Sequence, residues 1–263
     1  METSTQQAWK QFWDVTAEGT NPLGAIDIPE ISPQAYEAAN IRINQLLTLS
    51  ACDTVLNIGC GPGLFEERFA TVVKNIVGVD FAHTMVDKAR HRNSAVGNAY
   101  FFQASGTALP FKEGQFTKVL CYGVVHYFSE AEVIQLLTEI RRVASKGALV
   151  LLGDVEDVTE SAEASSLIGK TASWTTGEIG RLVHRGTKRV RSELMRRVAR
   201  LKRKWKSFTG QYVFVPKPHH LFNYSRNLIL DLTTAVGYEG QIVEQEAERF
   251  APGRYHVVLR VPE

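Results

Sequence analysis

The chain has 263 residues, of which 44% are hydrophobic and 22% charged, a composition typical of a globular protein with a sizeable core. Its N-terminus lacks a basic flank followed by an apolar run, and no segment reaches the roughly 20 apolar residues of a bilayer span. We therefore expect neither a signal peptide nor a membrane helix. Cys52, Cys60 and Cys121 are scattered without metal-ligand spacing, which favours free thiols in a cytoplasmic protein.

The net charge of +2 is unevenly distributed along the chain. Residues 181–206 hold eight Arg and four Lys against the single acid Glu193, whereas the rest of the chain holds 18 basic and 27 acidic residues. Within and just after this segment, apolar residues recur at helical spacing: Val190, Leu194, Val198, Leu201, Trp205 and Phe208. The pattern predicts an amphipathic helix with one strongly basic face.

Residues 1–50 are expected to form an N-terminal helical cap. Trp9, Phe12 and Trp13 fall on one helical face, and a second helix is predicted from about Pro33 to Leu49, with the proline in its first turn. Large aromatic side chains near a terminus either pack onto the domain or close over a ligand as a lid. The sequence leaves both alternatives open.

Short apolar runs then alternate with helical patterns over residues 51–155. The predicted strands are 54–59, 75–80, 99–105, 116–123 and 147–155, and the predicted helices between them are 65–74, 84–93 and 130–147, the last with a glycine stop. Strands that are apolar on both faces and separated by helices are typical of a parallel sheet covered on two sides. The fold class is therefore α/β, with a doubly wound, mostly parallel sheet.

The alternation is interrupted over residues 156–220, which is too long for an ordinary loop, so we interpret this stretch as a basic helical insertion after the fifth strand. It resumes over residues 221–263 with a helix that ends at Gly237 and two closing strands, 240–247 and 254–263. These complete a seven-stranded sheet.

A glycine-rich turn follows the first of these strands, with glycines at 59, 61 and 63. Such a turn brings backbone amides toward a ligand that a Cβ would block, although it is also found as a plain strand-to-helix turn. Asp80 ends the next strand, where an acid accepts hydrogen bonds from a ribose diol. Dinucleotide sites want a glycine where this chain has Leu64, so the spacing favours a ligand without a pyrophosphate and makes a dehydrogenase the weakest alternative.

Four ordered motifs carry a family resemblance: "VLNIGCGPG", "VGVDFAHTMVDKAR", "ASGTALPFKEGQFTKVLCYGVVHYF" and "RRVASKGALVLLGDV". Together they resemble the successive motifs of class I S-adenosylmethionine-dependent methyltransferases over roughly residues 50–155. The resemblance implies a Rossmann-like fold, S-adenosyl-L-methionine as cofactor and methyl transfer as activity.

The resemblance also implies roles for single residues. The loop glycines would line the methionine part of the cofactor, Asp80 would hold the ribose hydroxyls, and Met85 would pack on the adenine, its alternative being a core methionine. The residues expected around the cofactor are Asn57, Gly59, Cys60, Gly61, Gly63, Asp80, Phe81, Met85, Ser105, Gly106 and Tyr122. Two positions depart from the family pattern, since Ser105 and Thr117 stand where acids are usual. We expect cofactor binding to survive these changes at reduced affinity.

Catalytic candidates are few because the cofactor carries the reactive carbon. His126 follows the fourth strand, where ligands bind in an open parallel sheet, and is either a general base or a packing residue. His219 and His220 end the insertion and either enter the acceptor pocket or lie on the surface. Pocket hydroxyls are also offered by Tyr36, Tyr122 and Tyr127. No H-x-x-x-H or acidic metal pattern occurs, so we expect no metal.

The basic insertion leaves three alternatives open. It is a lid or packed helix over the acceptor, whose cations suit an anionic substrate; or it lies on an anionic membrane through Trp205 and Phe208; or it binds tRNA or another nucleic acid. We favour O-methylation of a small molecule such as a saccharide or natural product. The alternatives are a nucleic-acid methyltransferase that uses residues 181–206 and a catalytically silent cofactor-binding protein. The oligomeric state is left open.

Overall fold

The computed structural model describes residues 9, 10, 12–14, 33–157, 221–245 and 254–263. Most of the predicted insertion, with His219, His220 and the basic helix, lies outside these described residues. The predicted division into cap, core, insertion and closing elements therefore stays a prediction.

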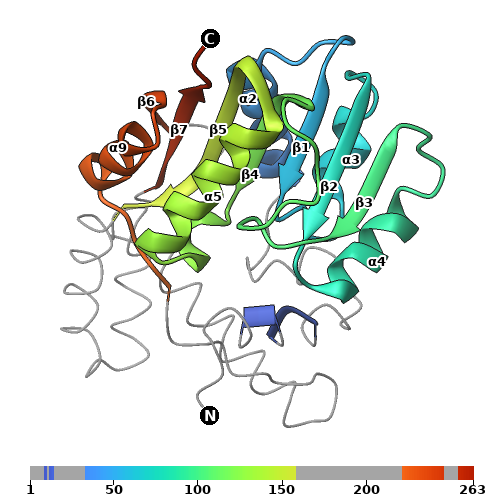
Figure 1. Ribbon diagram of the computed structural model, residues 1–263. Coiled ribbons are helices and arrows are strands. Elements are labelled where there is room, and N and C mark those ends of the chain that lie inside the picture. The colour runs from blue at the N-terminus through green and yellow to red at the C-terminus, as the bar shows by residue number, and fades with distance from the viewer. Residues whose placement is uncertain (1–8, 11, 15–32, 158–220, 246–253) are drawn as a thin grey trace, which may run out of the picture.

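The described residues form a seven-stranded sheet in the order β3-β2-β1-β4-β5-β7-β6 (Figure 1). The strands are β1 (Thr54–Ile58), β2 (Asn75–Asp80), β3 (Ala99–Gln103), β4 (Phe116–Tyr122), β5 (Ala144–Glu156), β6 (Glu239–Glu244) and β7 (Arg254–Arg260). β1 to β5 run parallel, and β7 is antiparallel to both β5 and β6. This confirms the doubly wound, mostly parallel sheet.

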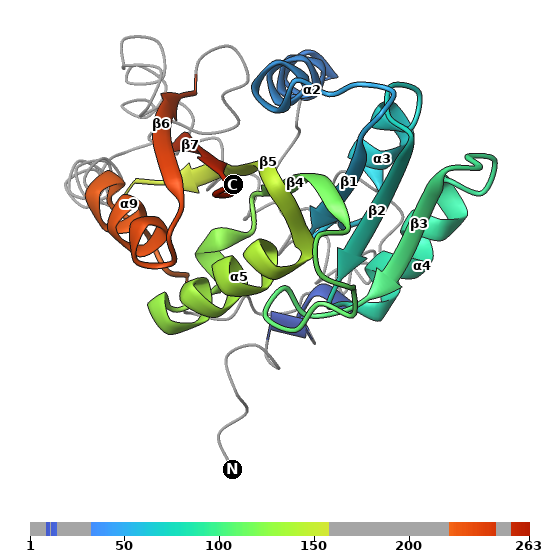
Figure 2. The same ribbon diagram turned by 45° about the horizontal axis from the view of Figure 1, so that its top comes forward.

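Helices cover both faces of the sheet (Figure 2). One face carries α2 (Pro33–Leu47), α3 (Leu64–Phe69) and α4 (His83–Arg92); the other carries α5 (Glu130–Val143) and α9 (Arg226–Ala235). The apolar sides of α5 and α9 pack on the sheet in one hydrophobic cluster, and those of α2 and α3 in another. β1 and β2 are therefore buried on both sides, which explains their continuous apolar runs.

Local signals explain where several helices begin. Ser129 and Glu132 form a capping box at the start of α5, and the Ser225 hydroxyl accepts a hydrogen bond from the Leu228 amide at the start of α9. Gly237, at φ +86°, follows the end of α9 as predicted.

Two helices end several residues earlier than predicted. The helix predicted to reach Gly147 ends at Val143, because Ala144 already pairs with Phe116 as the first residue of β5. The helix predicted over 65–74 ends at Phe69, because the Asn98 side chain donates to the carbonyls of the turn that follows. In both cases contacts from distant residues override the local pattern.

Residues 9, 10 and 12–14 lie at the carboxyl ends of the parallel strands (Figure 1). Residues 9, 10 and 12–14 are helical, and Trp9, Phe12 and Trp13 are buried against Ala82 and Met85. This pairing places an aromatic helix over the edge of the sheet where ligands bind in open α/β folds.

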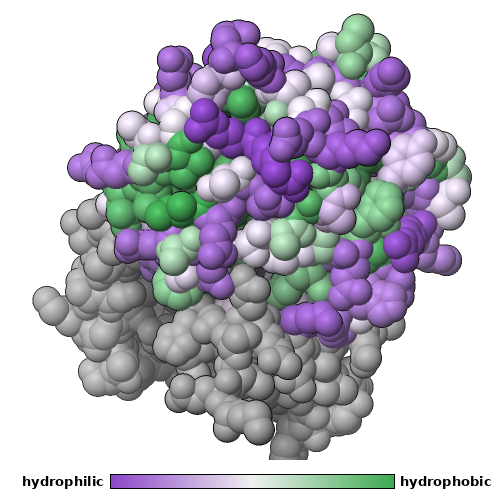
Figure 3. All heavy atoms as spheres, viewed as in Figure 1, coloured by the Kyte–Doolittle hydropathy of each residue, from purple (hydrophilic) through white to green (hydrophobic). Residues whose placement is uncertain are grey.

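The described surface is mixed in polarity. On the face seen in Figure 3, hydrophilic side chains predominate, and a hydrophobic patch lies over α9. Among the described residues, no helix combines the length and apolar character needed to cross a bilayer.

Candidate active site

The glycine loop between β1 and α3 is folded back on its own strands. The amides of Gly59 and Cys60 both donate to the Val79 carbonyl, and the amide of Gly63 donates to the Cys60 carbonyl. These three amides are therefore bonded within the protein, where they fix the shape of the loop.

The three glycines of the loop serve different purposes. A Cβ on Gly59 would lie 2.3 Å from Val124 Cγ2, and one on Gly63 would lie 2.6 Å from Asn93 Nδ2, so packing alone requires glycine at both. A Cβ on Gly61 would have no described atom within 4 Å, although φ is +52°. Gly61 is thus the position where the loop is open to a ligand.

Asp80 lies beside Gly61 at the carboxyl end of β2. Its Oδ2 accepts from the Gly61 amide at 3.0 Å and its Oδ1 from the Ala82 amide at 2.9 Å. Burial raises the pKa of this carboxyl to about 6, with a further contribution from the nearby Asp14. An ionised carboxylate accepts about four hydrogen bonds, so these two bonds do not use all of its lone pairs.

A buried amide and acid support the loop from beneath. Asn57 Nδ2 donates to Glu66 Oε1 at 2.7 Å, and burial raises the pKa of Glu66 to about 7. The Cys60 side chain packs in a separate cluster with Val86 and Phe101. Asn57 and Cys60, both predicted to bind the cofactor, therefore direct their side chains into the protein. Sequence reasoning missed Glu66, since nothing in "FEERF" separates it from its exposed neighbour Glu67.

The aromatic helix packs next to Asp80. Trp9, Phe12 and Trp13 form a hydrophobic cluster with Ala82 and Met85. Phe81, Tyr127 and Leu221 pack against its edge. Asp14 Oδ1 accepts from the Thr84 amide at 3.2 Å in the first turn of α4. The helix thus forms one wall of the site, and Met85 contacts that wall.

Comparison with known proteins agrees with this geometry. Residues 55–147 match a family model described as a methyltransferase domain. The malonyl-[acyl-carrier protein] O-methyltransferase of Legionella pneumophila is 30% identical over 91 residues, which is 34% of this chain and 31% of that protein. The 23S rRNA (uracil(1939)-C(5))-methyltransferase RlmD of Colwellia psychrerythraea is 36% identical over 101 residues, 36% of this chain and 22% of that protein. The matches thus span less than a third of these relatives.

A solved structure extends the likeness beyond the matched segment. Phosphoethanolamine N-methyltransferase 1 of Haemonchus contortus, in complex with phosphoethanolamine and S-adenosylhomocysteine, superposes with a TM-score of 0.64 at 15% identity over 98% of this chain and 49% of that one. This likeness concerns the fold. Residues 55–147 therefore match a methyltransferase domain, and the described residues have the Rossmann-like fold of that methyltransferase.

The residues of the methyltransferase domain fit its cofactor, S-adenosylmethionine. Gly61 provides open backbone, and the Asp80 carboxylate next to it has lone pairs for a ribose diol. The loop amides are already bonded, which suits a cofactor that brings no pyrophosphate. The individual cofactor roles stay predictions.

Both departures from the family pattern have a local explanation. The Ser105 hydroxyl forms a hydrogen bond with the Thr107 hydroxyl at 2.9 Å. The next residue, Gly106, is required by packing, because a Cβ there would lie 2.9 Å from Leu136 Cδ1. Thr117 Oγ1 donates to Asp53 Oδ1 at 2.7 Å at the amino ends of β1 and β4, far along the strands from the site.

Of the three predicted catalytic residues the structure describes His126 alone, which lies after β4. His126 is buried in the 3₁₀ turn Val125–Tyr127, 4.3 Å from the Tyr127 ring. The Tyr127 ring in turn contacts Trp9 and Trp13, which brings this turn against the aromatic helix. His126 therefore lies at the predicted edge, and its catalytic role stays a prediction.

The predicted tyrosine hydroxyls differ in their surroundings. The Tyr36 hydroxyl donates to the Leu64 carbonyl at 2.6 Å, and burial raises its pKa to about 12. The Tyr122 ring covers Gly153, and its hydroxyl lies 3.4 Å from Gln245 Nε2. Tyr36 is thus bonded to the start of α3, whereas Tyr122 reaches the ends of β5 and β6.

A polar cluster at the end of β5 was not predicted. Asp154 is 3% exposed and binds Arg254 and Gln245, which lie 100 and 91 residues away in sequence. His256 accepts from the Asp154 amide at 3.2 Å. No sequence motif joins these residues, because only the return of β7 to the sheet brings them together.

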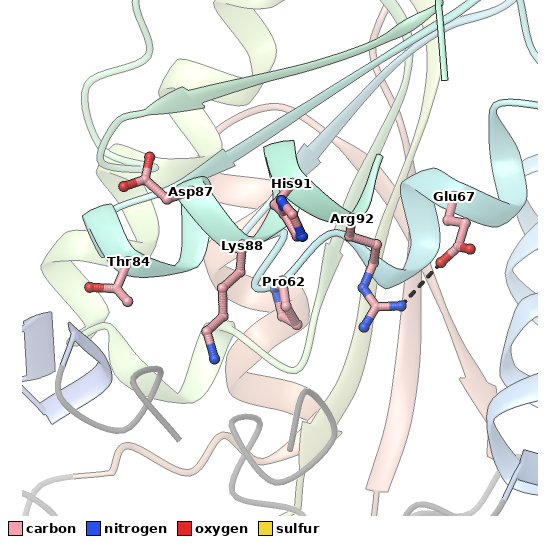
Figure 4. A pocket seen from close by; sticks show the side chains of 7 residues that line it. All are labelled: Pro62, Glu67, Thr84, Asp87, Lys88, His91 and Arg92. Carbon is pink, nitrogen blue, oxygen red and sulfur yellow. Dashed lines mark hydrogen bonds and ion pairs between the residues drawn. The ribbon is translucent and has the colours of Figure 1, made fainter. Parts of the chain in front are cut away.

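A separate pocket of about 650 Å³ lies on the α4 side of the glycine loop and contains none of the predicted site residues. Figure 4 shows Lys88, His91 and Arg92 around Pro62, with Arg92 paired to Glu67 at 3.2 Å. Over the described ranges, no group of three or more His, Cys, Asp or Glu side chains could hold a metal ion.

Proposed function

We propose that this protein transfers a methyl group from S-adenosylmethionine to a small molecule, by O-methylation of a saccharide or natural product. The observation that carries the methyl-transfer part is the pairing of Asp80 with the Gly61 amide beside open backbone. The small-molecule part rests on the aromatic helix, which packs over the carboxyl edge next to Asp80 and narrows the access to the site.

Each part of the edge has a separate task in this proposal. When bound, the cofactor would supply an electrophilic methyl group: the acceptor oxygen would form the new bond to carbon, the sulfur would keep the electron pair of the broken bond, and the proton of the acceptor would go to a base. Asp80 orients the ribose, and Trp9 and Trp13 exclude water. His126, in the turn after β4, is the candidate for taking the acceptor proton.

A nucleic-acid acceptor is the second candidate. It is favoured by the twelve basic residues in the segment 181–206 and by the rRNA methyltransferase among the relatives. It would require the basic segment to dock RNA close to the site, and such binding would weaken steeply with salt.

One labelling experiment separates these alternatives. The protein is incubated with S-adenosylmethionine labelled in the methyl group, together with either a small-molecule extract or total RNA, with Asp80→Ala as the inactive control. We expect label in the small-molecule fraction only. Label in RNA would support the second candidate, and absence of label despite measured cofactor binding would identify a silent cofactor-binding protein.

A further inference from the structure

The backbone of β5 is distorted where the strand reaches the carboxyl edge. Leu152 pairs with Val257 and Val155 with Tyr255, so two residues of β5, Gly153 and Asp154, oppose His256 alone. Such a bulge redirects side chains. Asp154 adopts φ +57°, a left-handed conformation that is uncommon for a residue other than glycine.

The bulge holds the Asp154 carboxylate in one position. Oδ2 accepts from Arg254 Nη1 at 2.6 Å, and Oδ1 accepts from Gln245 Nε2 at 2.9 Å. Each carboxylate oxygen has two lone pairs, and each of these bonds uses one of them. One lone pair on each oxygen is therefore left for a further hydrogen bond.

The carboxylate borders the cofactor loop through two residues of the β4 end. A Cβ on Gly123, at φ +69°, would meet a single described atom outside its chain neighbours within 4 Å: Asp154 Oδ2, at 3.8 Å. The next residue, Val124, is the one that packs on Gly59. The space over Gly123 thus adjoins the cofactor loop on one side and the Asp154 carboxylate on the other.

We infer that Asp154 is an acceptor-binding residue, whose carboxylate, in place of His126, accepts the hydrogen bond from the hydroxyl or amine that receives the methyl group. This inference rests on the methyl-transfer function proposed above. Arg254 and Gln245 are positioning residues, since they act through Asp154.

The surrounding charges narrow the class of reacting group. Arg254 pairs with Asp154 and Glu156, and Arg226 pairs with Asp157 and Glu244. Among these described residues four carboxylates share two guanidinium groups. The reacting group is therefore a neutral hydroxyl or an amine and not a carboxylate or phosphate, which this end of the sheet would repel.

The test compares two cofactor analogues and needs no knowledge of the acceptor. Sinefungin carries an amine in place of the transferable methyl group, whereas S-adenosylhomocysteine carries nothing there. We expect Asp154→Asn to weaken sinefungin binding about tenfold, as for one lost hydrogen bond to a charged group, and to change S-adenosylhomocysteine binding less than about twofold. Asparagine tolerates the left-handed backbone, so the substitution preserves the bulge.

Glu156→Gln is the matched control, because it removes a carboxylate from the same arginine, whose Nη2 lies 3.4 Å away. It should leave the ratio of the two affinities unchanged. Asp154→Gly is the second variant if the asparagine variant fails to fold, since glycine accepts the same φ. Equal loss of both ligands in the Asp154 variants, or no loss of either, would overturn the inference. Failure of the unmodified protein to bind either analogue would instead overturn the proposed function.

Discussion

Two regions of the carboxyl edge of the sheet are built by different means. We call the glycine loop with Asp80 the cofactor half, and Asp154 with Arg254 and Gln245 the acceptor half. At the ends of β1 and β2, Asp80 is held by two backbone amides, and its partner Gly61 lies 19 residues away. At the ends of β5 and β7, Asp154 is held by two side chains that lie 91 and 100 residues away. A change in β6 or β7 can therefore alter the acceptor half while the loop and Asp80 remain as they are. This division suits a fold in which one cofactor serves many acceptors.

The largest effect should come from breaking the cofactor half. Asp80→Ala removes the acceptor for the ribose hydroxyls, and we expect S-adenosylhomocysteine affinity to fall about 100-fold in calorimetry. Asp87→Ala, an exposed acid on α4, is the control and should bind normally. Unchanged affinity in Asp80→Ala would show that the ribose is held elsewhere.

A second prediction concerns Glu66, which supports the cofactor half from below. Because burial raises its pKa from 4.5 to about 7, the folded protein keeps a proton that the unfolded chain releases between these values. The free energy of unfolding should therefore fall as pH rises from about 4.5 to 7 and stay level above pH 7. The contribution of Glu66 to this fall is about 3 kcal/mol. The raised pKa of Asp80 adds a decline of its own.

Glu66→Gln removes the Glu66 part of this dependence. Asn57 Oδ1 and Glu66 Oε2 have no hydrogen-bond partner among the described residues. A glutamine at position 66 replaces one of its carboxylate oxygens by an NH₂ group, which is a donor for Asn57 Oδ1. Urea denaturation at pH 5 and pH 8 should show the variant gaining stability over the unmodified protein only at pH 8. A gain of equal size at both pH values would contradict the protonation argument.

A third prediction separates ligand contact from backbone strain. Gly61 and Gly114 both have positive φ and no described atom within 4 Å of an added Cβ, but Gly114 lies in the turn before β4. Both alanine variants should lose about 1 kcal/mol of stability, while only Gly61→Ala should lose cofactor affinity, about tenfold. Equal affinities in the two variants would place the cofactor away from the loop.

The smallest effect is expected at the amino ends of the strands. Thr117→Ala removes the bonds to Asp53 Oδ1 and from the Thr54 amide, and should cost about 1 kcal/mol in urea denaturation. Its affinity for S-adenosylhomocysteine should equal that of the unmodified protein. Lost affinity would mean that the two ends of the sheet are coupled.

The position of the glycine loop beside Asp80 could be predicted from the sequence because the information for it is local. The strand run, the glycine spacing and Asp80 all fall within 26 residues, from Val55 to Asp80, and each has a period or a backbone requirement that can be recognised. The mostly parallel sheet could be predicted because its strands alternate with helices along the chain.

The acceptor half could not be predicted in the same way. The bulge at Asp154 depends on how many residues of β5 oppose β7, and a strand pattern does not encode that register. The helix ends at Val143 and Phe69 were missed for a related reason. Phe116 pairs with the residue after Val143, and the Asn98 side chain donates to the residue after Phe69, and both partners are distant in sequence. Long-range pairing decides both.

Calorimetric titration of the unmodified protein with S-adenosylhomocysteine and, in parallel, with reduced nicotinamide adenine dinucleotide tests the central claim most directly. The Gly61–Asp80 geometry predicts saturable heat at one site for the thioether and none for the dinucleotide. No heat with the thioether, or equal binding of the dinucleotide, would contradict it.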